Sequence, residues 1–181
     1  MRDTAAPTNL LPFLAALVGC MLHILAARAE QVGSFRDWTA FVHQDRDGKL
    51  CYIVSEPKNQ EGNYTRRGKA AVFVSRLPTD PPRLEVNVQP GYAYKQGLPV
   101  EVVVDSGPTF QLFTQGEHAW ARDGEDTALI EAMRAGSRMT VRGTSTRDTF
   151  SLDTFSLLGF TAAYNAMMDA CKDARPAAQR R

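Results

Sequence analysis

Two histidines and two cysteines are the side chains best suited to chemistry beyond the apolar N-terminal stretch of this chain: His43, His118, Cys51 and Cys171. A cysteine beside a histidine could act as a nucleophile, because the imidazole would take up the thiol proton. Metal sites need three or four ligands at recognisable spacing, and the sequence has no H-x-H, H-E-x-x-H or C-x-x-C pattern. It also has no G-x-S-x-G elbow and no P-loop. We therefore expect both histidines to be structural and predict no catalytic residue, metal or cofactor.

The two cysteines allow one intramolecular pairing, Cys51 with Cys171. In an oxidising compartment a disulfide is the default expectation. It would close a loop of about 120 residues and contribute up to roughly 4–5 kcal/mol to stability in the chain-entropy account. Two alternatives stay open: a pair of buried unpaired thiols, and a hydrolase in which Cys51 is the nucleophile. Cysteines this far apart do not fit a thioredoxin-like redox motif.

The densest group of basic side chains is Arg66, Arg67 and Lys69, at the end of the long polar stretch 56–69. We predict a mobile surface loop over this stretch. Its basic side chains are candidates for contact with anionic sugars, lipid headgroups or an acidic partner, and the alternative is an ordinary solvated loop flank. Asn63-Tyr64-Thr65 matches the glycan-acceptor pattern, which we interpret as chance. Trp38 and Trp120 are expected in the core or at its rim rather than on a carbohydrate platform.

The first 29 residues have the pattern of an export signal. Arg2 precedes an almost uncharged apolar run over 10–25, and Ala27-Arg28-Ala29 has the small-x-small pattern that a signal peptidase recognises. We predict a signal peptide over 1–29, cleaved between Ala29 and Glu30. An uncleaved anchor is an alternative, although the run is shorter than the roughly 20 residues that span a bilayer. Lipidation is another, because Leu17-Val18-Gly19-Cys20 resembles a lipobox; we expect membrane attachment only if Cys20 is lipidated.

The length and charge of the remaining chain limit its organisation and its partners. The predicted mature residues suit one domain with a real core, which we place at 30–173, followed by a disordered tail over 174–181. Without the signal segment, basic and acidic residues are equal in number, so the formal charge is zero. This balance argues against nucleic acid or an anionic membrane surface as a dominant partner.

Short segments rich in Val, Phe, Tyr and Thr, separated by Pro, Gly and Asp, indicate an all-β domain. Apolar residues alternate in several of them, as in 84–88, whereas 100–104 is apolar enough to be buried on both faces. Asp47-Gly48 and Ser106-Gly107-Pro108 are hairpin signals. The predicted strands are 38–43, 50–55, 70–76, 83–88, 100–105, 109–114, 118–122, 138–144 and 149–155.

Two segments have helical patterns. Residues 127–135 carry an apolar stripe, with Asp126 or Thr127 available as N-cap and Gly136 as the C-terminal glycine. The second segment, 160–171, has apolar residues at the spacing of an amphipathic helix. This spacing directs Cys171 toward the core, so a disulfide to Cys51 would fasten the last helix to an early strand.

The order of these features resembles the invasion-associated locus B family of exported bacterial proteins. The resemblance covers nearly all of 37–172, and one departure is Asp148, where a glycine is expected before Thr149. The matching elements are Asp37-Trp38, Cys51, Arg66-Arg67, Pro90-Gly91-Tyr92, Val104-Asp105, Ala119-Trp120, Leu129-x3-Met133-x2-Gly136, Gly143-x-Ser145, Phe155-Ser156-Leu157-x-Gly159-Phe160 and Cys171.

The resemblance implies an immunoglobulin-like β-sandwich with one short helix and a C-terminal amphipathic helix. It also implies a periplasmic setting, no known enzymatic activity, and paired cysteines at Cys51 and Cys171. The family name comes from a link to host-cell invasion. Our first hypothesis is therefore an exported, non-enzymatic envelope protein with a binding or structural role, whose partner is an envelope protein or a cell-wall component. A second hypothesis is a periplasmic carrier of a small apolar ligand lined by Phe160, Tyr164 and Met167, and a third is the Cys51-dependent hydrolase.

Overall fold

The structure is a computed structural model that describes residues 29–44 and 48–172. Within these ranges the chain forms eleven strands and two helices, which confirms the all-β prediction. The strands are β1 (Glu30–Phe35), β2 (Trp38–Gln44), β3 (Lys49–Ser55), β4 (Asn59–Gly62), β5 (Ala71–Leu77), β6 (Arg83–Gln89), β7 (Val100–Val104), β8 (Thr109–Gln115), β9 (His118–Trp120), β10 (Arg138–Thr144) and β11 (Phe150–Ser156); the helices are α1 (Asp126–Ala135) and α2 (Phe160–Ala170). The predicted signal peptide, except for Ala29, and the whole predicted tail over 174–181 lie outside the described residues.

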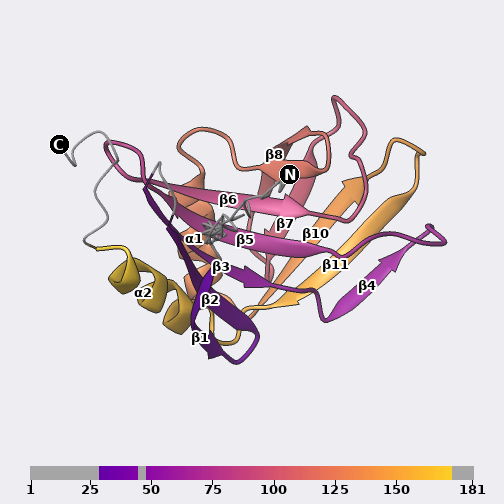
Figure 1. The fold of residues 1–181 in the computed structure, drawn as a ribbon. Coiled ribbons are helices and arrows are strands. Elements are labelled where there is room, and N and C mark those ends of the chain that lie inside the picture. The colour runs from indigo at the N-terminus through magenta and orange to yellow at the C-terminus, as the bar shows by residue number, and fades with distance from the viewer. Residues whose placement is uncertain (1–28, 45–47, 173–181) are drawn as a thin grey trace, which may run out of the picture.

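The strands form one antiparallel ladder that folds into two layers. Its order is β1-β2-β3-β5-β6-β9-β8-β7-β10-β11-β4. The change of layer occurs in β8, whose first residues pair with β7 and whose last three, Phe113 to Gln115, pair with β9. The first layer contains β1, β2, β3, β5, β6 and β9, and the second contains β7, β10, β11 and β4. Figure 1 shows α2 beside β1–β3 and β4 at the opposite end of the molecule.

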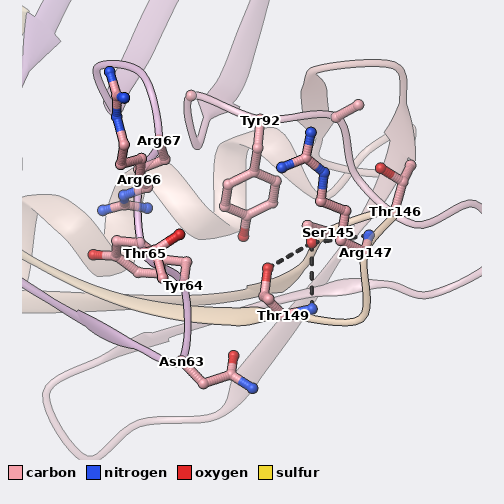
Figure 2. A pocket seen from close by; sticks show the side chains of 12 residues that line it. Asn63, Tyr64, Thr65, Arg66, Arg67, Tyr92, Ser145, Thr146, Arg147 and Thr149 are labelled. Carbon is pink, nitrogen blue, oxygen red and sulfur yellow. Dashed lines mark hydrogen bonds between the residues drawn. The ribbon is translucent and has the colours of Figure 1, made fainter.

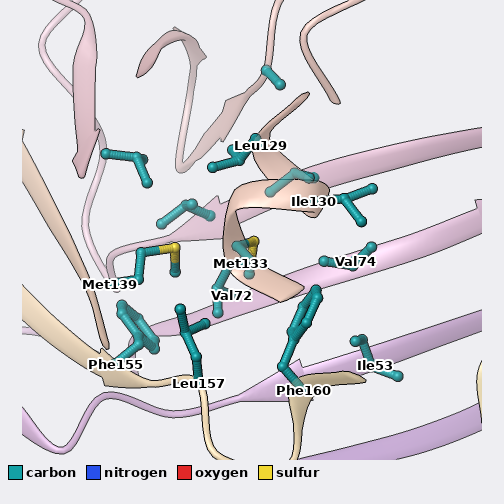
Figure 3. Packing of buried hydrophobic residues seen from close by; sticks show 14 of the residues in the cluster. Ile53, Val72, Val74, Leu129, Ile130, Met133, Met139, Phe155, Leu157 and Phe160 are labelled. Atoms are coloured by element: carbon teal, nitrogen blue, oxygen red, sulfur yellow. The ribbon is translucent and has the colours of Figure 1, made fainter. Parts of the chain in front are cut away.

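The core lies between the two layers and is completed by α1. Strand residues alternate as their sequences indicate: on β10, Met139, Val141 and Gly143 are buried, while Arg138 and Arg142 are exposed. Figure 3 shows the buried side chains of both layers around the apolar stripe of α1, which consists of Leu129, Ile130 and Met133. The helix therefore fills the space at one end of the sandwich.

The C-terminal helix packs on the first strands and is held there covalently. Phe160, Ala163 and Met167 of α2 are buried, and the Phe160 ring meets Trp38 of β2 edge-on with centroids 4.8 Å apart. Directly after the helix, Cys171 is disulfide-bonded to Cys51 of β3, with Cα atoms 6.0 Å apart. This confirms the predicted pairing, and the alternative of two unpaired thiols is wrong.

Several local predictions need correction. The polar stretch 56–69 is not simply a loop, because β4 lies within it and pairs with β11. Strand β1 was not predicted. The segment 100–104 is not buried on both faces, since Glu101 is exposed and the valines alternate. The N-cap of α1 is Glu125, which makes no side-chain capping hydrogen bond. Asp126, one of the predicted caps, instead accepts a hydrogen bond from Val86 N at 2.7 Å.

Candidate functional site

The cysteines and histidines do not come together as a catalytic group. Both sulfur atoms are in the disulfide, so Cys51 has no thiol to offer as a nucleophile. His118 lies on β9 with its Nδ1 3.1 Å from Asn87 Oδ1, and its ring stacks on Trp120. His43 lies on β2, opposite Leu50 of β3. Among the described residues, no group of three or more His, Cys, Asp or Glu side chains could hold a metal ion.

Ser55 and Lys58 have the S-x-x-K spacing of some nucleophilic serines. The geometry of this pair is structural. Ser55 Oγ donates to the carbonyl oxygen of Asp37 at 2.7 Å, and Lys58 Nζ lies 2.5 Å from the Asp37 carboxylate. The hydrogen bond from Lys58 lowers the pKa of Asp37, and Ser55 and Lys58 both bind Asp37.

A polar cleft of about 430 Å³ lies at the end of the sandwich where β10, β11 and the segment 63–68 meet. Figure 2 shows the Tyr92 ring between two walls, formed by the segment 63–67 on one side and the turn 145–149 on the other. Three arginines and no aspartate or glutamate contribute to its lining. The lining residues are Asn63, Tyr64, Thr65, Arg66, Arg67, Gly91, Tyr92, Ala93, Ser145, Thr146, Arg147 and Thr149.

A buried ion pair supports the first wall. Arg67 Nη1 donates to Asp153 Oδ2 at 2.8 Å and to the carbonyl oxygen of Pro90 at 3.2 Å, and Nη2 bonds the other carboxylate oxygen. The two side chains are only 3% and 2% exposed. Burial alone would lower the pKa of Arg67, but the hydrogen bond and charge of Asp153 outweigh it and raise that pKa. The guanidinium also lies 4.8 Å above the centroid of the Tyr64 ring.

The three predicted basic residues therefore have different surroundings. Arg67 is not a solvent-facing residue of a mobile loop, because its charge is neutralised by Asp153 beneath the cleft. Arg66 lines the same cleft and is exposed. Lys69 is outside the lining, with a side chain 91% exposed and its Nζ 3.8 Å from Glu56. Of the three, Arg66 remains the candidate for direct contact with a partner.

The first wall is also held through its backbone. Asn63 N donates to the Phe150 carbonyl at 3.3 Å, and Phe150 N donates to Asn63 Oδ1 at 2.7 Å. At the other end Gly68 N donates to the carbonyl oxygen of Gly91 at 2.8 Å. Gly91 has φ +79°, and a Cβ there would overlap the carbonyl of Gly68, so this close approach requires glycine. The wall is thus attached to β11 at one end and to the segment after β6 at the other.

The turn 145–149 forms the second wall. Ser145 Oγ accepts hydrogen bonds from Arg147 N at 3.1 Å and Thr149 N at 3.3 Å, which closes the turn around its side chain. Asp148, where the family resemblance suggested glycine, has φ 61°, a region that aspartate tolerates. Its carboxylate forms an ion pair with Lys95. Arg147 is exposed on this turn and lines the cleft.

Tyr92 lines the cleft, and the buried Tyr94 packs against Tyr92. Tyr92 Oη lies 2.7 Å from Ser151 Oγ, and burial raises the pKa of Tyr92. The ring of Tyr94 meets that of Tyr92 edge-on at 5.5 Å, and a Cβ on Gly143 would lie only 2.6 Å from the Tyr94 ring. Glycine at 143 therefore leaves room for Tyr94, whose hydroxyl is buried without a hydrogen-bond partner.

The space expected for an apolar ligand is filled by the protein itself. Phe160 and Met167 are fully buried, and Tyr164 stacks on Phe160 with its ring centroid 6.2 Å away. The guanidinium of Arg134 lies over the Tyr164 ring at 5.4 Å. These residues belong to the contact between α2 and the first layer. Trp38 is buried as expected, whereas Trp120 is half-buried and stacks on Phe113.

Asp153 and Arg147 were not singled out from the sequence, and Tyr92 was named only as part of the family resemblance. A signal for Asp153 was present, because the alternation in β11 places Ser151, Asp153 and Phe155 on one inward face. An acid on an inward face requires a cationic partner from elsewhere in the chain. No comparable signal marks Arg147, whose place across the cleft from Arg66 depends on the tertiary fold.

Comparisons with known proteins identify the family. No curated protein matches the chain. The crystal structure of invasion associated protein b from Bartonella henselae matches with a TM-score of 0.57 and 18% sequence identity, over 81% of this chain and 99% of that chain, which shows a shared fold. The described part of the chain has no helix that is long and apolar enough to cross a membrane. The family model described as invasion associated locus B (IalB) protein matches residues 38–168, and the chain therefore belongs to the IalB family.

Proposed function

We propose that this chain is an exported, non-enzymatic binding protein of the bacterial cell envelope that acts in contact with host cells. The observation that carries the proposal is the polar cleft, whose lining has three arginines and no carboxylate. Family membership supports the link to invasion at family level. The disulfide supports an oxidising compartment such as the periplasm. The first residue of β1 is Glu30, which is also the predicted mature N-terminus.

The partner of the cleft is an envelope protein or cell-wall component that carries negative charge. Arg66 and Arg147 are exposed on opposite walls, and among the described residues neither has an ion-pair partner. The balanced formal charge of the whole chain does not oppose this, because the attraction is local to the cleft. The same balance favours a specific partner over nucleic acid.

The two other hypotheses have less support. A thiol hydrolase requires a free thiolate, and both sulfur atoms are occupied by the disulfide. An apolar carrier requires a cavity beside α2, where Phe160 and Met167 are fully buried against protein atoms. The cleft favours a polar ligand because ten of its twelve lining residues carry a hydroxyl, amide or guanidinium group.

Capture from an envelope extract tests the proposal. The mature protein would be immobilised as wild type, as an R66Q/R147Q double variant, and as an R122Q control that removes an exposed arginine outside the cleft. We expect wild type and R122Q to retain the same envelope component and the double variant to lose it. Equal retention by all three proteins, or no reproducible component, would contradict the proposed function.

A further inference from the structure

We propose that the cleft binds a small acidic saccharide, of one or two sugar rings, through a carboxylate on the sugar. This inference rests on the proposed function, which makes the cleft the binding site, and it adds the chemical class of the ligand. Three properties of the cleft support it: its uncompensated positive charge, its hydroxyl-rich lining and its preformed walls.

The positive charge of the cleft is not cancelled from within. Asp153 is the carboxylate below the first wall, and it is already paired with Arg67. Asp148 is next to Arg147 in sequence, and it is already paired with Lys95. The guanidinium groups of Arg66 and Arg147 are therefore available to an external anion, and the planar guanidinium fork matches a carboxylate in geometry.

The remaining lining suits a sugar better than an apolar group. Asn63, Thr65, Thr146 and Thr149 contribute amide and hydroxyl groups, and the Tyr64 and Tyr92 rings contribute apolar surface. Because the side-chain oxygen of Asn63 accepts from Phe150 N, its NH₂ group is the part left to donate to a ligand. Sugar hydroxyls both donate and accept, so they can satisfy such a mixed lining. A volume of about 430 Å³ accommodates a ligand of one or two rings.

The walls of the cleft are held in place without a ligand. The first is fixed by the Arg67–Asp153 pair and by the Gly68–Gly91 contact. The second is fixed by the hydrogen bonds to Ser145 Oγ and by a hydrogen bond of 3.0 Å from Thr146 N to the Ala93 carbonyl. A preformed site spends less of its binding free energy on ordering the protein, which is important for a small ligand.

Titrations of the mature protein followed by NMR would test the ligand class, with glucuronate, glucose and inorganic phosphate as probes. We expect glucuronate to shift the resonances of residues lining the cleft and to bind at least about tenfold more tightly than glucose or phosphate. R66Q and R147Q should each weaken glucuronate binding about tenfold, the change expected for loss of one charge-assisted contact. R122Q should bind glucuronate as wild type does.

Each other outcome would overturn the inference. Glucose binding as tightly as glucuronate would remove the role of the carboxylate, and phosphate binding as tightly would leave only a general anion site. Equal weakening by R122Q would indicate non-specific attraction between charges. Because these titrations use no envelope extract, they can fail while the capture experiment succeeds, which would leave the proposed function standing with a ligand of another class, such as an acidic peptide.

Discussion

Arg67 and Asp153 lie 86 positions apart in the sequence and form a buried ion pair where the apolar core gives way to the cleft. On β11, the inward-facing residues change from Phe155 through Asp153 to Ser151 along this direction. Removing two charges from water is costly, and the cost is offset only by close pairing and further hydrogen bonds. Arg67 meets this requirement in part, because Pro90 accepts a third hydrogen bond while Nε remains without a partner.

Replacement of one member of this pair should destabilise the fold strongly. We expect Arg67→Met to lower the free energy of unfolding by about 3–5 kcal/mol, because Asp153 would be left as an unpaired buried charge. Urea denaturation would measure the change. Arg66→Gln is the matched control, since it alters an exposed neighbour and should change stability by less than about 0.5 kcal/mol. An R67M/D153L double variant should recover much of the loss, and R67M as stable as wild type would contradict the role assigned to the pair.

The part of the fold that follows from local pattern was predictable. Alternation of apolar residues located most strands, and the 3.6-residue period placed Cys171 on the buried side of α2. Strands β1 and β4 were not predicted because both are edge strands whose residues are mostly exposed, so neither shows alternation. Asp126 or Thr127 was expected to cap the helix, but the Asp126 carboxylate accepts a hydrogen bond from Val86 N of β6, a contact that only tertiary packing creates.

The candidate site was predictable only in part. The basic stretch was visible in the sequence, but the sequence did not show which of its arginines is buried in an ion pair and which is exposed. Whether Arg66 or Arg67 faces the solvent depends on the partner Asp153, which comes from a strand distant in sequence. Arg147 and Tyr92 join the cleft because the two layers meet at that end, and no local pattern encodes this meeting.

The disulfide should contribute measurably to stability. Cys171→Ser should lower the melting temperature of the oxidised protein and loosen α2, since the bond closes a loop of about 120 residues and contributes up to roughly 4–5 kcal/mol. Reductant should lower the melting temperature of wild type to a similar extent and have no effect on the variant. Equal melting curves for reduced and oxidised wild type, after mass spectrometry has verified reduction, would rule this out.

Gly159, which precedes α2, should not tolerate a side chain. It has φ +90°, and a Cβ there would overlap the carbonyl oxygen of Phe35 on β1. Gly97 is a matched control, because it has φ +79° and a Cβ added to it would meet no other atom within 4 Å. We expect Gly97→Ala to cost about 1–2 kcal/mol for the backbone conformation alone. Gly159→Ala should lower the free energy of unfolding, measured by chemical denaturation, by at least about 2 kcal/mol more than Gly97→Ala does. Equal losses in the two variants would show that the backbone around Phe35 shifts to make room for the added Cβ at little cost.

Removing the hydroxyl group of Tyr94 and removing that of Tyr92 should have different effects on the stability of the protein at neutral pH. Tyr94 Oη is buried without a partner, so Tyr94→Phe loses no hydrogen bond and should leave stability unchanged or raise it by about 1 kcal/mol. Tyr92 Oη is hydrogen-bonded to Ser151, so Tyr92→Phe should lower stability by about 1 kcal/mol. Denaturation at pH 7 would compare them, and a large loss in Tyr94→Phe would indicate an unrecognised partner for its hydroxyl.

Tyr94 should also make the stability of the fold fall at alkaline pH. Burial raises the pKa of Tyr94 far above its ordinary value of 10.0, so the folded protein keeps this proton after the unfolded chain has lost it. The unfolded state then binds fewer protons, and the free energy of unfolding must fall as the pH rises above about 10. Tyr94→Phe should make this fall shallower without abolishing it, because burial also raises the pKa of Tyr52 and Tyr92. Chemical denaturation of wild type and variant between neutral and alkaline pH would measure both slopes, and identical slopes would exclude Tyr94 as a source of the alkaline instability.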